Sequence, residues 1–260
     1  MIRFPGAKEG IKEASLSTPE NFFGEGIAER YDESHSEMFA SSIVGPAVDF
    51  LAGVAGKGAA LELGIGTGRI ALPLARRGVR VHGIELSEAM VQQLRAKPGG
   101  DDVEVTIGDF ATTRVEGAFS VAYLVFNTIN NLTSQDAQVA CFQNVATHLE
   151  PGGCFVIEVG VPSLRRLPYG ETFNAFHLSD AYVGINEYDV ANQGLVSHHY
   201  RAVGDRFERR SIPFRYVWPS ELDLMARLAG MTLRERWSSW KRERFTSEST
   251  KHVSVWERST

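Results

Sequence analysis

Residues 59–75 of the chain read AALELGIGTGRIALPLA. The run that ends at Leu63 has the length of a buried parallel strand, and the residues after the glycines return to helical spacing. Between them, Gly64, Gly66 and Gly68 occupy every second position. Glycines let the backbone turn sharply and let a ligand lie against the main chain, while free N–H groups opening the next helix face that ligand. The stretch predicts a strand, a tight turn and a helix that bind a polar, partly anionic small molecule.

The spacing of these glycines distinguishes two kinds of nucleotide site. The dinucleotide fingerprint G-x-G-x-x-G requires glycine at its sixth place, which counted from Gly64 is Arg69. The pattern is instead Glu62-x-Gly64-x-Gly66-x-Gly68. It resembles the first motif of the class I methyltransferases that use S-adenosylmethionine, in which the acidic residue and the glycines hold the methionine end of the cofactor. The resemblance implies that all four residues bind S-adenosylmethionine.

A second predicted strand, over residues 79–85, ends in Glu85, 17 positions after Gly68. In a doubly wound sheet this distance places a carboxylate at the carboxyl end of the neighbouring strand, where both ribose hydroxyls of an adenosine can donate to it. Leu86 and Met90 follow on the next turn and helix. We expect both of them to pack against the adenine, although a methionine at such a position is also typical of an ordinary core.

A third strand, over residues 103–107, leads into Gly108, Asp109 and Phe110. In the methyltransferases that this chain resembles, the carboxylate of such a Gly-Asp turn accepts from the adenine amino group and an aromatic neighbour flanks the ring. Asp109 and Phe110 are therefore predicted cofactor residues. An Asx turn at Asp109 is the other interpretation, and the two are compatible.

The strand predicted over residues 119–126 is apolar on both faces, which is typical of a central strand. It ends at Phe126 and Asn127, at the edge where cofactor and acceptor should meet, and we expect Phe126 to contact the cofactor. Amino-methyltransferases of nucleobases place Asp or Asn, two prolines and an aromatic residue at this edge. The absence of these prolines argues against methylation of DNA.

Methyl transfer from a sulfonium is an in-line displacement, so the protein mainly positions the acceptor and excludes water. If the acceptor is an amine, only its neutral form can attack, and a nearby polar side chain can orient it and take up the proton. The candidates are Asn127, Asn130, His198, His199 and Tyr200. Because successive side chains of a strand point to opposite faces, at most one of the two histidines faces the pocket. We expect Asn127 or His199 to line the acceptor site, although either histidine could lie on the surface.

The order of predicted elements divides the chain into four parts. Residues 1–57 form an N-terminal helical flap, 58–160 a Rossmann-like cofactor-binding core, 161–217 an inserted antiparallel sheet, and 218–260 the completion of the core. The fold class is α/β, a doubly wound, mostly parallel seven-stranded sheet with the inserted sheet and the flap. The inserted sheet is predicted to roof the pocket or to form an oligomer contact.

Two local predictions concern helix starts, and a third concerns the flap. Pro46 suits the first turn of a helix, and Thr133 with Asp136 resembles a capping box. In small-molecule methyltransferases, which the flap also resembles, a segment like that around Tyr31 brings its tyrosine over the cofactor. Packing of Tyr31 between two helices is the alternative.

The composition is that of an ordinary globular protein, with 260 residues, 43% of them hydrophobic and a net charge of −5. The acidic balance argues against a nucleic-acid partner, and no stretch suits a membrane span or a signal peptide, so we expect a cytoplasmic protein without a membrane partner. Cys141 and Cys154 are expected to be buried thiols, and no metal site is predicted.

These patterns together predict a methyltransferase that uses S-adenosylmethionine and acts on a small molecule. The inserted sheet resembles that of small-molecule N-methyltransferases of antibiotic and deoxyaminosugar biosynthesis, which favours N-methylation of an amine-bearing secondary metabolite or amino sugar. An O-methyltransferase, an aminopropyl transferase and a non-catalytic S-adenosylmethionine-binding protein are the alternatives. A homo-oligomer formed through the inserted sheet is also possible.

Overall fold

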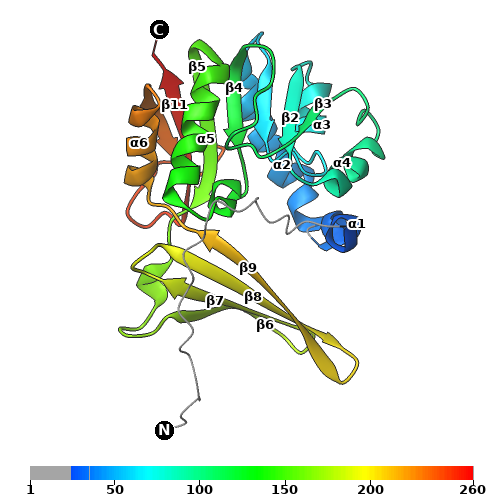
Figure 1. Ribbon diagram of the computed structural model, residues 1–260, viewed down its shortest axis with the longest axis vertical. Coiled ribbons are helices and arrows are strands. Elements are labelled where there is room, and N and C mark those ends of the chain that lie inside the picture. Colours follow the sequence, from blue (N-terminus) through cyan, green and yellow to red (C-terminus); the bar gives the residue numbers. More distant parts are fainter. Residues whose placement is uncertain (1–24, 35, 260) are drawn as a thin grey trace.

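The computed structural model describes residues 25–34 and 36–259. A seven-stranded sheet with the order β10-β11-β5-β4-β1-β2-β3 forms its centre (Figure 1). The strands of this sheet are β1 (Ala60–Leu63), β2 (Val81–Glu85), β3 (Glu104–Ile107), β4 (Phe119–Leu124), β5 (Leu149–Gly160), β10 (Met231–Trp237) and β11 (Lys251–Arg258). Only β11 runs against its neighbours β5 and β10. The doubly wound, mostly parallel sheet is thereby confirmed.

Helices cover both faces of this sheet, because its central strands are apolar on both sides. All six residues of β4 are buried. Val121 and Tyr123 belong to one apolar cluster, and Ala122 and Leu124 belong to the other. The first cluster includes residues of α2 (Ser41–Ala55), α3 (Ala71–Arg76) and α4 (Glu88–Arg95), and the second includes residues of α5 (Gln135–His148) and α6 (Pro219–Leu228). The prediction that this strand is central is confirmed.

A second, four-stranded sheet lies between β5 and α6 in the chain and below the main sheet in Figure 1. Its strands are β6 (Phe173–Leu178), β7 (Tyr182–Asp189), β8 (Gly194–Val203) and β9 (Arg206–Arg215). All neighbours pair antiparallel. The buried Arg215 at the end of β9 forms an ion pair with Glu221 of α6 at 2.7 Å, so the inserted sheet is tied to the core where it rejoins it.

The N-terminal part contains α1 (Glu25–Ser34), a 3-10 turn η1 (Ser36–Phe39) and α2. Residues 1–24 of the predicted flap lie outside the described residues. Two details of the helix starts were predicted wrongly. Pro46 lies inside α2 rather than in its first turn, and α5 is capped by Ser134, whose side chain accepts from the Ala137 N–H, rather than by Thr133. The four-part division of the chain stays a prediction.

Among the described residues, no helix is long and apolar enough to cross a membrane. Cys141 and Cys154 are both buried and free, as expected.

Candidate functional site

The glycine turn that follows β1 lies at the carboxyl ends of the parallel strands. Gly64, Gly66 and Gly68 have φ angles of +68°, +54° and +80°, a left-handed conformation that other residues adopt only with strain. A Cβ atom on Gly64 would lie 2.9 Å from Cγ2 of Thr128. The turn therefore requires glycine, and it leaves backbone without side chains at the edge of the sheet.

Glu85 ends β2 and binds this turn through both of its carboxylate oxygens. Oε2 accepts from the Gly66 N–H at 2.8 Å, and Oε1 accepts from the Ser87 N–H at 2.9 Å. Burial raises the pKa of Glu85, and the backbone hydrogen bonds from Ser87 and Gly66 oppose this rise. The Leu86 N–H also acts on this carboxylate, and its roughly four acceptor sites leave room for a further donor. A ribose hydroxyl would suit this site, although the ribose contact stays a prediction.

The other predicted adenine residues surround the same turn. The side chain of Met90 lies 3.7 Å from where a Cβ on Gly66 would be, and the Phe110 ring lies 3.8 Å from the corresponding point on Gly64. Leu86 is half-buried between Glu85 and the start of α4. Oδ1 of Asp109 accepts from the Ala111 N–H at 2.9 Å, so the Asx turn is present, and the second carboxylate oxygen remains available for an amino group.

Glu62 is held inside the core, on β1. Its side chain is buried and accepts a hydrogen bond from the Tyr123 hydroxyl at 2.9 Å. It also accepts a hydrogen bond from the Ala71 N–H. Burial raises the pKa of Glu62 to about 8, against the opposing effects of the Tyr123 hydrogen bond and the Arg69 charge. These contacts let Glu62 fix the start of α3 to β4 and support the turn. Direct contact of Glu62 with the cofactor stays a prediction.

The turn after β4 has an unusual backbone. Phe126 and Asn127 are consecutive non-glycine residues with φ angles of +56° and +62°, a conformation that costs about 1 to 3 kcal/mol per residue and clusters at functional sites. Oδ1 of Asn127 accepts from the Gly160 N–H at 2.7 Å. The Arg69 guanidinium lies 5.4 Å from the centre of the Phe126 ring. Asn127 therefore links the end of β4 to the end of β5. Its side-chain NH₂ group can donate a hydrogen bond to a methyl-accepting substrate.

Tyr31 lies on α1 close to this edge. Burial raises the pKa of its phenol, and the charges of Arg69, Glu85 and Asp32 also act on it. Tyr31 is therefore near both the ribose candidate Glu85 and the start of α3. Its contact with the cofactor stays a prediction.

His199 lies on β8, in the second sheet. Its Nδ1 is 2.5 Å from the Tyr182 hydroxyl, and its Nε2 is 3.2 Å from Oγ of Ser197. The neighbouring His198 has different partners, Glu187 at 3.0 Å and Ser211 at 2.8 Å, as the alternation of side chains requires. The structure thus brings the cofactor candidates together at one edge, whereas these contacts of His199 are within the inserted sheet.

Glu158 was missed by the sequence analysis. It stands near the end of β5, accepts from the Phe126 N–H at 3.3 Å and pairs with Lys251 at 3.1 Å. It also lines a cavity of about 270 Å³ together with Val125, Arg69 and Trp240. A single carboxylate near the carboxyl end of an apolar strand, in the segment CFVIEVG, is the signal that could have identified it.

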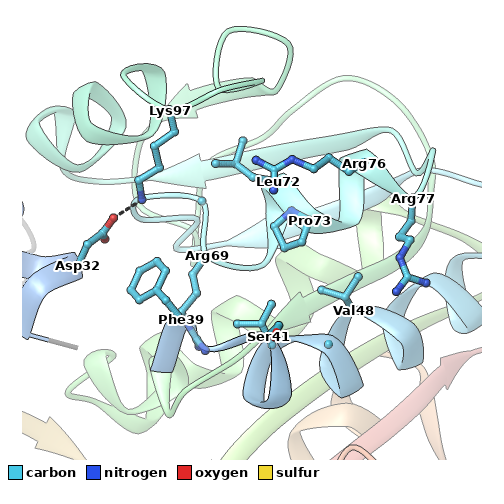
Figure 2. Close-up of a pocket in the computed structure, with 13 residues that line it drawn as sticks. Asp32, Phe39, Ser41, Val48, Arg69, Leu72, Pro73, Arg76, Arg77 and Lys97 are labelled. Carbon is cyan, nitrogen blue, oxygen red and sulfur yellow. Dashed lines mark ion pairs between the residues drawn. The ribbon is translucent and has the colours of Figure 1, made fainter. Parts of the chain in front are cut away.

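A second cavity, of about 430 Å³, lies between α2 and α3 (Figure 2). Of the predicted cofactor residues, only Gly68 lines it. Its walls are Val44, Val48, Leu72 and the ring of Pro73, with basic side chains around them. This cavity therefore flanks the glycine turn, and Gly68 is the one candidate cofactor residue among its described lining residues.

Comparison with known proteins agrees with this geometry. Residues 60–153 match the family model described as a methyltransferase domain. The structure is similar to that of the CcbJ methyltransferase from Streptomyces caelestis, with 39% sequence identity and a TM-score of 0.80. The similarity covers 92% of this chain and 98% of the CcbJ chain. The chain belongs to the S-adenosylmethionine-dependent methyltransferases, and S-adenosylmethionine is its cofactor.

Two further relatives cover most of the chain. The cypemycin N-terminal methyltransferase from a Streptomyces species is 26% identical over 238 residues, which are 88% of this chain and 97% of the relative. CalS10 from Micromonospora echinaspora, an amino pentose methyltransferase solved with S-adenosylmethionine bound, is 20% identical with a TM-score of 0.67 over 92% of this chain and 99% of that chain. CalS10 is similar to this chain in fold.

Proposed function

We propose that this enzyme transfers the methyl group of S-adenosylmethionine to the nitrogen of an amine-bearing small molecule, such as a secondary metabolite or an amino sugar. The observation that carries the proposal is the Glu158 carboxylate, which lines the cavity at the ends of β4 and β5. A carboxylate can accept a hydrogen bond from an amine and take up its proton. The name of the cypemycin N-terminal methyltransferase supports nitrogen as the acceptor atom.

The described residues fit the cofactor. The glycine turn offers backbone without side chains, Glu85 offers a carboxylate, and Oδ1 of Asn130 is buried without a hydrogen-bond partner among the described residues. Tyr31, Glu62, Gly64, Gly66, Gly68, Glu85, Leu86, Met90, Asp109, Phe110 and Phe126 are the residues that we propose to hold it. The Arg69 guanidinium beside Phe126 adds a cation suited to the carboxylate of the methionine end.

When bound, S-adenosylmethionine would supply an electrophilic methyl group to the acceptor nitrogen, and its sulfur would keep the electron pair of the broken carbon–sulfur bond. The nitrogen must arrive as a neutral amine with its lone pair free. Glu158 would accept the N–H of this amine, and after transfer it would receive the proton that the methylated nitrogen releases. Asn127 holds the turn that carries Phe126, and His199 is a further candidate for contact with the acceptor from the inserted sheet.

The test is a turnover assay of the full chain with S-adenosylmethionine and matched pairs of small acceptors, amino sugars and their hydroxyl counterparts, with mass spectrometry of the products. We expect N-methylated products, and a Glu158→Gln variant should lose about tenfold or more in kcat/KM because the proton acceptor is gone. Glu150→Gln, which changes an exposed carboxylate at the start of the same strand, serves as the control.

Methylation of the hydroxyl counterparts in place of the amines would overturn the assignment to nitrogen. Tight binding of S-adenosylhomocysteine with no turnover on any acceptor would favour a non-catalytic binding protein.

A further inference from the structure

A cluster of polar contacts joins α1 to the glycine turn. Oγ1 of Thr67, the buried residue between Gly66 and Gly68, donates to Oδ1 of Asp32 at 2.6 Å. Asp32 is the neighbour of Tyr31 on α1. Because Thr67 and Asp32 are 35 residues apart, this hydrogen bond exists only in the folded chain and fixes α1 against the turn.

Lys97 completes the cluster from the end of α4. Its ammonium forms an ion pair with Asp32 and donates to the Thr67 carbonyl oxygen at 2.7 Å. It also lies 5.2 Å from the centre of the Phe39 ring in η1. Figure 2 shows the Asp32–Lys97 pair beside Phe39. Lys97 therefore contacts α1, η1 and the glycine turn at once.

The position of this cluster matters for the cofactor. Asp32 and Lys97 are about one-third and one-quarter exposed, so the pair is less screened by water than an ion pair on the open surface. α1 packs on α4, and Tyr31 lies within reach of the Glu85 charge. Residues of α1 therefore lie next to Glu85 and the glycine turn, at the edge where the adenosine is expected.

We propose that Asp32 and Lys97 are cofactor-retention residues, which hold α1 over the cofactor site by joining it to Thr67 of the glycine turn and to the end of α4. In this role they act through Thr67 and α1 and do not take part in methyl transfer. They set how fast S-adenosylhomocysteine dissociates after each turnover. The proposal does not depend on the identity of the methyl acceptor.

The test measures S-adenosylhomocysteine dissociation from the full chain by rapid filtration of the radiolabelled compound against an unlabelled excess. Asp32→Asn and Lys97→Met each remove a charge-assisted contact, so we expect the dissociation rate constant to rise roughly tenfold to a hundredfold, with the association rate constant changed by less than about threefold. The matched control is the exposed pair Asp49 of α2 and Arg77 at the end of α3, joined at 2.7 Å; Arg77 lies at the other end of the cavity from Asp32 (Figure 2). Asp49→Asn and Arg77→Met should leave dissociation unchanged.

A second measurement needs no variant. Because added salt weakens a partly exposed ion pair, dissociation from the wild-type protein should accelerate with ionic strength, and Lys97→Met should abolish this acceleration. Dissociation rates within about threefold of wild type in both variants, or an equal rise in the control pair, would overturn the proposal. A loss of thermal stability without faster dissociation would show that the cluster only holds the fold together.

Discussion

The buried carboxyl group of Glu62 predicts how the stability of the cofactor-free protein depends on pH. Burial raises its pKa from 4.5 to about 8, so between these two values the folded chain binds a proton that the unfolded chain does not. Linkage then requires the free energy of unfolding to fall as the pH rises through this window. The contribution of Glu62 is fully present below about pH 4.5 and is lost above about pH 8.

The magnitude follows from the difference between the two pKa values. At 1.36 kcal/mol per pKa unit, a shift from 4.5 to about 8 corresponds to roughly 5 kcal/mol over the whole window. Glu62→Gln mimics the protonated acid, because the amide keeps an oxygen that can accept from the Tyr123 hydroxyl. The variant should therefore have about the same stability as the wild type at low pH and become progressively more stable than it toward pH 9.

The assay is urea unfolding of both proteins at a series of pH values between 5 and 9, with Glu150→Gln as the exposed control. We expect the difference in unfolding free energy between Glu62→Gln and the wild type to grow by several kcal/mol across the series, while the control difference stays flat. A Glu62→Gln difference that is constant to within about 1 kcal/mol would refute the reasoning. It would mean that Glu62 titrates at an ordinary pKa and that Tyr123 and Ala71 contact an ionised carboxylate.

Three further predictions concern binding, the glycine turn and acid stability. Glu85→Ala should weaken S-adenosylhomocysteine binding by about 1 to 3 kcal/mol in calorimetry, and a loss below about 0.5 kcal/mol would contradict the ribose assignment. Gly68→Ala places a Cβ at φ +80° and 3.0 Å from Leu72, whereas the Cβ of Gly78→Ala, at φ +85°, has no described atom within 4 Å. Both variants strain the backbone, but only Gly68→Ala also crowds a neighbour, so its melting temperature should fall further. Equal losses would mean that backbone strain alone sets the cost. Burial lowers the pKa of His252 from 6.5 to about 3, so its contribution to stability is lost as the pH falls through this window; His252→Gln should flatten the acid side of a melting-temperature profile, and an unchanged profile would refute this.

The centre of the fold was predictable because its signals are local. The glycines after β1 and the distance from Gly68 to Glu85 are features of short sequence segments, and each one corresponds to a required backbone geometry. The glycines correspond to the left-handed φ angles of the turn. The position of Glu85 corresponds to its hydrogen bonds from the Gly66 and Ser87 N–H groups. The candidate cofactor residues therefore appeared in the sequence before their arrangement was known.

The features that the sequence did not predict depend on contacts between distant segments, or belong to strands whose residues are mostly exposed. β6 contains mostly exposed residues and lacks a clear alternating pattern, so its sequence carries no strand signal. Pro46 is tolerated inside α2, where sequence rules expect proline in the first turn. Lys97 and Glu158 gain their importance from partners on other elements, which no local pattern reveals.

The inserted sheet leaves the core after β5 and rejoins it at Arg215, whose guanidinium contacts Gln138 of α5 and Glu221 of α6. The glycine turn, Glu85 and Asp109 all lie outside residues 161–217. The segment could therefore be replaced by the corresponding part of a related enzyme without changing any of the proposed cofactor residues, provided that the Arg215 junction is kept. A chimera built at these two boundaries would separate the methyl-transfer chemistry that the family shares from the inserted segment, which can vary between family members.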